Sequence, residues 1–470
     1  MTIWINVTTS VGHKQPPVGV VRVEQNIAWA LREALGEEQV RYCVWKAGRG
    51  DFVEIPAASV RASLTKKPSP DRPWCIRPSR SSEHQIAPIR FSAPLASIRT
   101  NLRSLARGSP CLVAGIRRLV EVGRSIQRGL GKWAFRTRMG LGRWLATSGG
   151  YVCNVLRPGD VLVILGIEWD ISFVLQELKN RVGIRIIGCC HDLGPIKYPQ
   201  YCLRYVAKQF PRYLMELVAG CDAIACVSEC TLRDLRAEIE RLGIPVPRLF
   251  TIRLGADLPM AAGSPSDLIS SLTERPYVLF VSTIERRKNH EVLYRAFHRL
   301  AEIHGRDRLP RMVFVGSPGW GVNDLLNDIK LDPVTKGIIV QLHQVSDHDL
   351  CVLYQKALFC VFPSLYEGWG LPVAEALGFG TPVVCSDRGS LPEVGGDLVE
   401  YLDPWDLPAW VHAIERLWLD GDYRRRLADR IAREYRMEDW SAAGTKIGRI
   451  ASRLEAGSDV HVVSNIHLET

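Results

Sequence analysis

Residues 361–377 read Val361-Phe-Pro-Ser-Leu-Tyr-Glu-Gly-Trp-Gly-Leu-Pro-Val-Ala-Glu-Ala-Leu377 and predict a strand, a tight loop and a helix. The run Leu358–Phe362 is short and apolar, which suits a buried parallel strand that the following proline ends. Gly368 and Gly370 let the loop bring backbone N–H groups close to a ligand, and Pro372 fits the first position of a helix. Because the positive end of that helix faces the loop, the loop is a natural seat for an anion such as phosphate.

Two carboxylates flank this anion seat. Glu367 lies on the loop and Glu375 lies about one turn into the helix, so we expect them to project toward opposite ends of a ligand. Carboxylates accept hydrogen bonds from hydroxyl groups, so a sugar at one end and a ribose at the other would be a chemically sensible occupant. The alternative is an ordinary strand, turn and capped helix with two solvated acids.

The spacing of Glu, seven residues and Glu, with Gly-Trp-Gly-Leu-Pro between, resembles the signature of the family-4 (group 1 type) retaining glycosyltransferases, which have the GT-B fold. This resemblance implies an α/β protein with two facing Rossmann-like doubly wound domains and a cleft between them. It also implies that Glu367 contacts the donor sugar and that Glu375 contacts the nucleotide ribose. The loop residues expected beside the donor are Gly368, Trp369, Gly370 and Leu371.

Length and composition indicate a two-domain intracellular protein. The 470 residues exceed what one hydrophobic core usually supports. The chain begins with an apolar-rich strand at Ile3–Val7 where a signal peptide would have a charged leader, and no apolar run approaches the roughly 20 residues of a membrane-spanning helix. The 13 cysteines include no Cys-x-x-Cys pair and suit reduced thiols. We therefore expect a cytoplasmic protein. The family resemblance implies a nucleotide sugar as substrate and no cofactor.

The formal charge of +10 is concentrated in one segment. Residues 61–150 contain eighteen Lys and Arg against three acids, which gives +15 and leaves the rest of the chain at −5. Within this segment, apolar and basic residues are expected on opposite faces of one helix: Leu112, Ile116, Leu119, Ile126 and Leu130 against Arg117, Arg124 and Arg128.

A basic amphipathic helix suits an anionic membrane surface, and we expect peripheral membrane contact through residues 99–144. The alternatives are a helix packed on its own domain with a solvated basic face, and a polyanionic acceptor. Nucleic acid is disfavoured, because the segment lacks a recognised nucleic-acid motif and the remaining chain is net acidic.

The loop after the first strand carries two further candidates. The resemblance places Gly19, in Pro-Val-Gly-Val-Val-Arg, close to the donor phosphates. Arg22 lies in the first turn of a helix predicted over Val20–Leu35, from which it can reach an anion. The alternative for Arg22 is a surface arginine whose aliphatic stem lies along the helix.

From Asp160 onward, short apolar runs alternate with helical stretches, which indicates a parallel, doubly wound sheet. Ligands of such sheets bind at the carboxyl ends of the strands. His191-Asp-Leu-Gly-Pro195 follows the run Arg185–Cys190, and the resemblance places His191 at the reacting centre with Asp192 beside it. An imidazole there can hydrogen-bond a sugar hydroxyl and support positive charge at the anomeric carbon. The alternative is a structural histidine.

A second α/β unit is predicted to start at Tyr277. Its first strand leads to Glu285-Arg-Arg-Lys-Asn-His290, where the resemblance assigns Lys288, with Arg287 beside it, to the donor diphosphate. Many family members have Gly-Arg where this chain has Ser-Thr283, so one phosphate-binding arginine is missing. Arg286 and Arg287 are the candidates to replace it, and the alternative is a solvated charge run that caps a helix.

We predict that no catalytic metal is bound. Ser346-Asp-His-Asp349 superficially matches the Asp-x-Asp motif with which metal-dependent glycosyltransferases hold a diphosphate. A serine followed three residues later by an acid, just before Leu350, predicts a helix cap instead.

Four segments make up the predicted chain. Residues 1–260 form an acceptor-side domain with the basic insertion at about 57–150, and residues 270–435 form the nucleotide-sugar-binding domain. Residues 436–456 form a helix that crosses back to the first domain, and residues 457–470 form a flexible tail.

The resemblance implies retaining transfer of a hexosyl unit by front-face attack, in which the leaving diphosphate takes the proton of the acceptor. Ser-Thr-Ile-Glu-x-Arg-Lys-Asn-His and His-Asp-Leu-Gly-Pro resemble bacterial mannosyltransferases of surface polysaccharide assembly, which favours GDP-mannose over UDP-sugars. The expected acceptor is a saccharide or lipid-linked saccharide. The rival functions are a GT-B-fold nucleotide-sugar epimerase and, more remotely, a nucleic-acid-binding protein that uses the basic insertion.

Overall fold

The structure is a computed structural model, and it describes residues 1–13, 19–46, 50–58, 60, 153–169, 171–258 and 264–455. The chain divides into two compact units, of which residues 1–45, 51–71 and 152–470 form the first. The second unit, residues 46–50 and 72–151, falls almost wholly outside the described residues. The predicted amphipathic helix, the membrane contact through 99–144 and the tail at 457–470 also lie outside them.

The first sheet has seven strands in the order β3-β2-β1-β4-β5-β6-β7. The strands are β1 Ile3–Asn6, β2 Val40–Lys46, β3 Asp51–Ile55, β4 Val161–Ile164, β5 Arg185–Cys190, β6 Ala223–Cys226 and β7 Arg248–Thr251. From β2 to β7 every neighbouring pair is parallel, and the register places Ile3 beside Val40 and Val161. Every residue of β1, β4 and β6 is buried, as expected of parallel strands that are covered on both faces.

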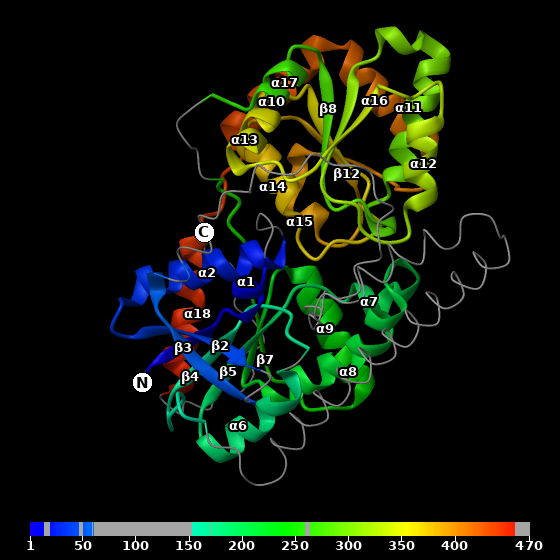
Figure 1. Cartoon of the computed structure of the whole chain (residues 1–470). Helices are drawn as coiled ribbons and strands as arrows, with labels where there is room; N and C mark the ends of the chain where they lie inside the picture. Colours follow the sequence, from blue (N-terminus) through cyan, green and yellow to red (C-terminus); the bar gives the residue numbers. More distant parts are fainter. Residues whose placement is uncertain are drawn as a thin grey trace, which may run out of the picture. The chain divides into compact units, whose positions relative to one another are not determined.

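The helices of the first sheet are α1 Thr8–Gly12, α2 Val20–Leu35, α6 Leu175–Val182, α7 Gly194–Lys197, α8 Arg204–Gly220 and α9 Glu229–Leu242, with short 3₁₀ turns η1 Ser172–Val174 and η2 Pro199–Tyr201. Figure 1 shows α2 on one side of this sheet and α6 and α8 on the other. The buried face of α2 includes Val23, Ile27 and Leu31, which recur every four residues. Helices therefore cover both faces of the first sheet. The loops that follow its strands lie at the carboxyl ends of those strands.

The second sheet has six strands in the order β10-β9-β8-β11-β12-β13, and all five pairings are parallel. The strands are β8 Tyr277–Val281, β9 Arg311–Val315, β10 Ile339–Leu342, β11 Phe359–Phe362, β12 Val383–Ser386 and β13 Glu400–Leu402. The helices are α10 Asp267–Leu272, α11 His290–His304, α12 Asn323–Leu331, α13 Asp347–Lys356, α14 Leu371–Gly378, α15 Leu391–Gly395, α16 Leu407–Leu419 and α17 Gly421–Glu434, with 3₁₀ turns η3 Arg286–Lys288, η4 Arg306–Arg308 and η5 Gly396–Leu398.

Helices cover both faces of this second sheet, with α13 and α14 on one side and α11 and α12 on the other (Figure 1). The order of the strands in the sheet places β8 and β11 side by side at its centre, although about eighty residues of sequence separate them. The loops that follow these two strands carry the basic run and the two-glutamate segment, so the topology brings both to one edge of the sheet.

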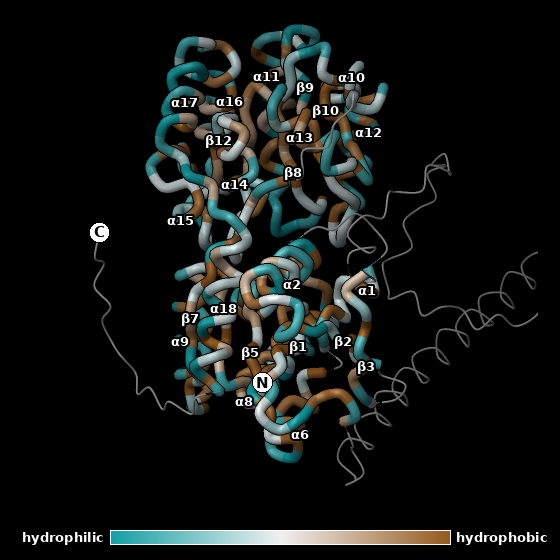
Figure 2. The backbone as a smooth tube through the Cα atoms, turned by 90° about the vertical axis from the view of Figure 1, so that its left-hand side faces the viewer, coloured by the Kyte–Doolittle hydropathy of each residue, from teal (hydrophilic) through white to brown (hydrophobic). Residues whose placement is uncertain are grey.

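Each sheet has its own hydrophobic core. In Figure 2 the hydrophobic colour is concentrated on the strands, whereas the helices alternate between hydrophobic and hydrophilic colours. Two doubly wound parallel sheets with separate cores confirm the predicted pair of Rossmann-like units.

The last described helix, α18 Trp440–Glu455, belongs to the core of the first sheet, to which it contributes Trp440, Ala443, Ile447 and Ala451. It packs along α2 at close range, because a Cβ at Gly444 would lie 2.8 Å from the backbone nitrogen of Leu31. The chain therefore completes its first core with residues that follow the whole of the second.

Candidate functional site

The segment 361–377 joins the end of β11 to α14. Gly370 precedes α14 with a φ of 120°, a conformation that favours glycine. The Ser390 hydroxyl donates to the carbonyl oxygens of Glu367 (3.2 Å) and Trp369 (2.6 Å). A Cβ at Gly389 would come within 2.3 Å of the Glu367 carbonyl oxygen, so glycine permits this approach. The loop is therefore held in one conformation before any ligand arrives.

Glu367 joins the two basic residues predicted for the donor diphosphate. Its Oε1 accepts from the Lys288 ammonium (2.5 Å), and its Oε2 accepts from the Arg287 guanidinium (3.0 Å). Burial alone would raise the pKa of Glu367, but the two cations hold it at about 2. The carboxylate is therefore ionised and keeps both cations in place.

Arg287 has two more partners. Its guanidinium pairs with Glu285 (2.9 Å) and donates to the carbonyl oxygen of Tyr366 (2.7 Å). Burial opposes the charged form, but Glu367 and Glu285 outweigh burial and raise the pKa of Arg287 above its ordinary value. Arg286 lies on the same turn, η3, with its side chain exposed. Of the two candidates to replace the missing arginine, Arg287 is the one that lies beside Glu367.

Glu375, the predicted ribose ligand, is 4% exposed. Its Oε1 accepts from the Arg22 guanidinium (3.2 Å), and its Oε2 accepts from the Tyr354 hydroxyl (2.8 Å). Burial raises the pKa of Glu375 and the positive charge of Arg22 partly offsets that rise. The structure thus brings together two residues that are 353 positions apart.

Arg22 is buried, so the alternative of a surface arginine is wrong. Besides Glu375, its guanidinium binds Asp347 at the start of α13 (2.6 Å). The predicted helix cap in the same turn is present, because the Ser346 hydroxyl accepts from the Asp349 N–H (3.1 Å). Asp347, which the sequence placed only in a capping segment, is therefore a partner of the buried Arg22.

His191 follows β5, and its Nε2 lies 2.6 Å from the carbonyl oxygen of Leu165. A carbonyl oxygen can only accept, so Nε2 carries the proton and Nδ1 bears a lone pair. Burial lowers the pKa of His191. The ring is therefore neutral and offers an acceptor at Nδ1.

The backbone after β5 contacts the two-glutamate loop directly. A Cβ at Gly368 would lie 1.9 Å from the carbonyl oxygen of His191, so this position requires glycine. The Thr231 hydroxyl donates to the Gly368 carbonyl oxygen (3.2 Å). Asp192 accepts from the N–H of Gly194 (2.8 Å) and so stabilises the turn that follows His191.

Gly19 stands at the start of α2 with a φ of 52°. No atom of the described residues beyond its chain neighbours lies within 4 Å of the place where a Cβ would be, and the backbone conformation itself favours glycine. Residues 14–18 before it lie outside the described part of the chain. Its role beside the donor phosphates stays a prediction.

Trp369 and Leu371 join the loop to both cores. Trp369 packs against the cores of the first and second sheets, and Leu371 belongs to the first. The Trp369 indole N–H is buried and has no hydrogen-bond partner among the described residues. The large side chain between the two glycines therefore acts as a packing element.

A second pair of carboxylates lies at the carboxyl ends of β1 and β4. Glu24 accepts from the Ser10 N–H (2.7 Å), and Glu168 accepts from the N–H (3.2 Å) and hydroxyl (3.1 Å) of Thr9 and from the amide of Asn6. Burial raises the pKa of Glu24 to about 7, and burial together with the charge of Glu24 raises the pKa of Glu168. The pair therefore holds a proton under mildly acidic conditions.

Sequence reasoning missed Tyr354, Asp347, Glu24 and Glu168. A weak signal existed for Glu24, because it lies among the buried positions of an amphipathic helix where a charged residue is unusual. The other three stand in ordinary helical or loop contexts, and only the tertiary structure gives them partners.

Among the described residues, no group of three or more His, Cys, Asp or Glu side chains is arranged to hold a metal ion. Within the same ranges, every helix is too short or too polar to cross a bilayer.

Comparison with known proteins gives one family match. A family model described as "Glycosyl transferases group 1" matches residues 269–434. This range contains η3, β11 and α14, and so includes Arg287, Lys288, Glu367 and Glu375.

Two relatives come from Escherichia coli. The chain is 31% identical over 268 residues to O-antigen chain mannosyltransferase B. This alignment covers 56% of this chain and 68% of that protein. The chain is 29% identical over 259 residues to serotype-specific mannosyltransferase WbdA, in an alignment that covers 52% of this chain and 31% of that protein. The chain thus spans about two thirds of the first relative and less than a third of the second.

Among solved structures, the chain resembles sucrose-phosphate synthase from Thermosynechococcus elongatus. The TM-score is 0.58 at 19% identity, over 97% of this chain and all of that one. At this identity the likeness concerns the fold alone, and it confirms the predicted GT-B class.

Proposed function

Because this chain belongs to the group 1 family of glycosyl transferases, we propose that it moves mannose from GDP-mannose to a saccharide or lipid-linked saccharide acceptor during surface polysaccharide assembly. Family membership confirms the resemblance and makes the chain a glycosyltransferase. The mannosyl donor is supported by the names of the two E. coli relatives, both of which are mannosyltransferases.

One observation carries the proposal: Glu367 holds Lys288 and Arg287 on its two oxygens at the carboxyl edge of the second sheet. Two adjacent cations suit the two phosphates of a nucleoside diphosphate. The carboxylate between them can accept from sugar hydroxyls with its remaining lone pairs. On donor binding, the cations would exchange part of their contact with Glu367 for the diphosphate.

The other residues take complementary roles in this proposal. Glu375 would accept from the ribose, and the N-terminus of α14 with the backbone of Gly368–Leu371 would face the diphosphate. His191, neutral and with its lone pair at Nδ1, would accept from a sugar hydroxyl near the anomeric carbon. Gly19, Arg22 and Asp192 would complete the donor site.

Transfer would retain the anomeric configuration by front-face attack. The bond between the anomeric carbon and the diphosphate oxygen breaks, the acceptor oxygen bonds to the same face, and the leaving diphosphate takes the acceptor proton. Lys288 and Arg287 would neutralise charge on the leaving group, so we propose that no metal ion is needed.

The test is slow hydrolysis of a panel of nucleotide sugars, GDP-mannose included, without acceptor and without metal. We expect GDP-mannose to saturate the protein and to release GDP and free mannose. Selective turnover of a UDP-sugar would overturn the mannosyl assignment but keep the transferase. Conversion of a donor to its epimer would favour the rival isomerase.

Cytoplasmic location with peripheral membrane contact through residues 99–144 is also a proposal, and it rests on the sequence alone. Sedimentation with anionic vesicles should exceed sedimentation with neutral vesicles and should fall with salt. Equal partitioning would remove the electrostatic argument, and salt-sensitive binding to mixed-sequence DNA would revive the nucleic-acid alternative.

A further inference from the structure

Each carboxylate oxygen of Glu375 accepts a hydrogen bond, and the two donors lie on helices that pack on different sheets. Arg22, on α2, donates to Oε1, whereas Tyr354, on α13, donates to Oε2. A carboxylate offers about four lone-pair directions, so each oxygen keeps capacity for a further donor. The two hydroxyls of a ribose are such donors.

Tyr354 is held in place by contacts of both its ring and its backbone. Its side chain is fully buried in the core of the second sheet, which also contains α14. Its ring stacks on Phe379 with centroids 5.7 Å apart and planes 13° apart. Its carbonyl oxygen accepts from the Thr381 hydroxyl (2.7 Å). Ring and backbone are thus both held, and the phenol oxygen is fixed relative to Glu375.

A fixed donor on one oxygen restricts the carboxylate. The terminal torsion of a glutamate is broad, so an unrestrained carboxylate can turn and accept from water or from any nearby donor. With Oε2 held by Tyr354, the remaining lone pairs point in set directions. Such a carboxylate distinguishes a ligand with two correctly placed hydroxyls from a ligand without them, because the mismatched ligand leaves the remaining lone pairs of a buried carboxylate without donors.

We propose that Tyr354 is the positioning residue that makes Glu375 selective for the ribose diol of the donor nucleotide. The inference rests on the proposed function, in which Glu375 accepts from the ribose. In this proposal Tyr354, whose side chain is fully buried, contacts neither the sugar nor the diphosphate. Its contribution is to increase the ratio between the affinity for ribose-containing nucleotides and the affinity for deoxygenated nucleotides.

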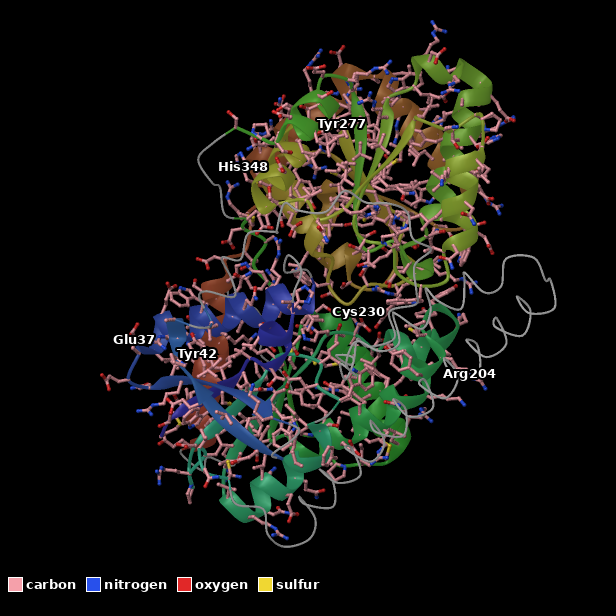
Figure 3. The ribbon with its side chains drawn as sticks, viewed as in Figure 1. Glu37, Tyr42, Arg204, Cys230, Tyr277 and His348 are labelled. Carbon is pink, nitrogen blue, oxygen red and sulfur yellow. The ribbon has the colours of Figure 1, made fainter. Side chains whose placement is uncertain are left out.

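The test compares Tyr354→Phe with Tyr277→Phe. Tyr277, labelled in Figure 3, lies on β8, and its hydroxyl donates to the carbonyl oxygen of Leu353 (2.7 Å). Both tyrosines are fully buried in the same core, and both substitutions remove one hydroxyl from one hydrogen bond. Calorimetric titration with GDP, UDP and their 2′,3′-dideoxy counterparts gives the dissociation constants, and thermal melting checks the fold.

In wild-type protein and in Tyr277→Phe, the dideoxy compound should bind more weakly than the parent nucleotide by the same factor. In Tyr354→Phe, that factor should shrink by roughly tenfold, which corresponds to about 1.4 kcal/mol. A purely structural role would weaken all four compounds alike and leave the factor unchanged, and that result overturns the inference. If wild-type protein binds neither GDP nor UDP, the proposed function fails, and the inference fails with it.

Phe379→Leu keeps the test decisive if Tyr354→Phe does not fold. Phe379 is partly exposed, so the change leaves the centre of the core intact but removes the ring on which Tyr354 stacks. The selectivity factor should fall in the same direction and by less. An unchanged factor in this variant would overturn the role of the fixed phenol.

Discussion

The salt bridges of Glu367 show how single side chains can order the proposed donor site in advance. Lys288 and Arg287 each have a flexible chain that would sample many rotamers in water. Glu367 holds both within hydrogen-bond distance, so much of the ordering entropy is lost during folding and not during donor binding. Any change at Glu367 therefore also affects the positions of the two cations.

Glu367→Ala and Lys288→Ala should lower turnover by about 10²- to 10³-fold while the protein stays folded, because each removes a charged contact from a buried site. Turnover of GDP-mannose and far-ultraviolet circular dichroism measure the two properties. Glu238→Ala is the control, because Glu238 pairs with the exposed Arg241 far along α9. Wild-type turnover in either site variant would mean that the donor binds elsewhere.

Glu24 should make stability depend on pH. Its pKa is about 7 in the folded protein against an ordinary value of 4.5, so the folded protein holds this proton more tightly than the unfolded chain. The contribution of Glu24 to stability is then fully present below about pH 4.5 and is lost as the pH rises through about 7. Glu24→Gln can still accept from the Ser10 N–H but cannot ionise. Relative to wild type, the free energy of unfolding of Glu24→Gln should rise by up to about 3 kcal/mol between about pH 5 and pH 8.

Urea unfolding at several pH values measures this difference, with Glu240→Gln, an exposed position of α9, as the control. Parallel curves for Glu24→Gln and wild type would contradict the raised pKa. Retention of the difference when Glu168 is also changed to Gln would show that Glu24 alone holds the proton.

At the residue scale, the family resemblance pointed to Glu367, Glu375, Arg287 and Lys288 as donor-site residues, and the structure places Arg287 and Lys288 against Glu367. The sequence could not predict that Glu367 would hold both cations, because about eighty residues separate them. The sequence could not predict the hydrogen bond from Tyr354 to Glu375 either, because nothing at this helix position indicates a carboxylate partner on another helix.

At the scale of elements, the packing of α18 on α2 depends on small residues. A Cβ at Gly444 would meet backbone atoms of Ala30 and Leu31 at 2.8 Å, whereas a Cβ at Gly448 would meet only side-chain ends of Leu35 and Leu31, at 3.1 Å or more. Backbone atoms can move apart only if the helices do. Side-chain ends can shift by a few tenths of an ångström.

Gly444→Ala should therefore lower the free energy of unfolding by roughly 1 to 3 kcal/mol, the usual cost of overpacking. Gly448→Ala, about one turn farther along the same helix, should be nearly neutral, because the helix propensity of alanine, worth about 1 kcal/mol, offsets a small adjustment. Denaturant titration of the two variants measures the contrast. Equal effects would show that the two helices are not held at the distance described.

The predicted apolar runs agree with the strands to within one residue. Ile3–Val7, Arg185–Cys190 and Leu358–Phe362 correspond to β1, β5 and β11. Because strands that are buried on both faces consist largely of apolar residues, an apolar run in the sequence shows where such a strand begins and ends. The sequence does not show the order of the strands in each sheet, because that order depends on which runs pair over long separations.

At the scale of the whole molecule, each cation of the proposed donor site is paired with a carboxylate. Among the described residues, three cations, Arg22, Arg287 and Lys288, pair with four carboxylates, Asp347, Glu285, Glu367 and Glu375. Ions that are paired within a few ångströms produce little field beyond a Debye length of about 10 Å. The site should therefore not attract the anionic donor over long distances.

The association rate of GDP-mannose should change little between about 0.05 and 0.5 M salt. Stopped-flow fluorescence measures the rate. A steep fall with salt would show that cations outside the described residues, such as those of residues 61–150, act on the incoming donor.

The return of α18 to the first core also sets an order of events during synthesis. Domains made early on the ribosome usually fold before later ones, but here the first core lacks one of its helices until residues 440–455 have been made. The interval covers translation of the entire second sheet. The apolar side of α2 that α18 covers is exposed to chaperones and proteases for all of that time, so the second domain has the opportunity to mature first.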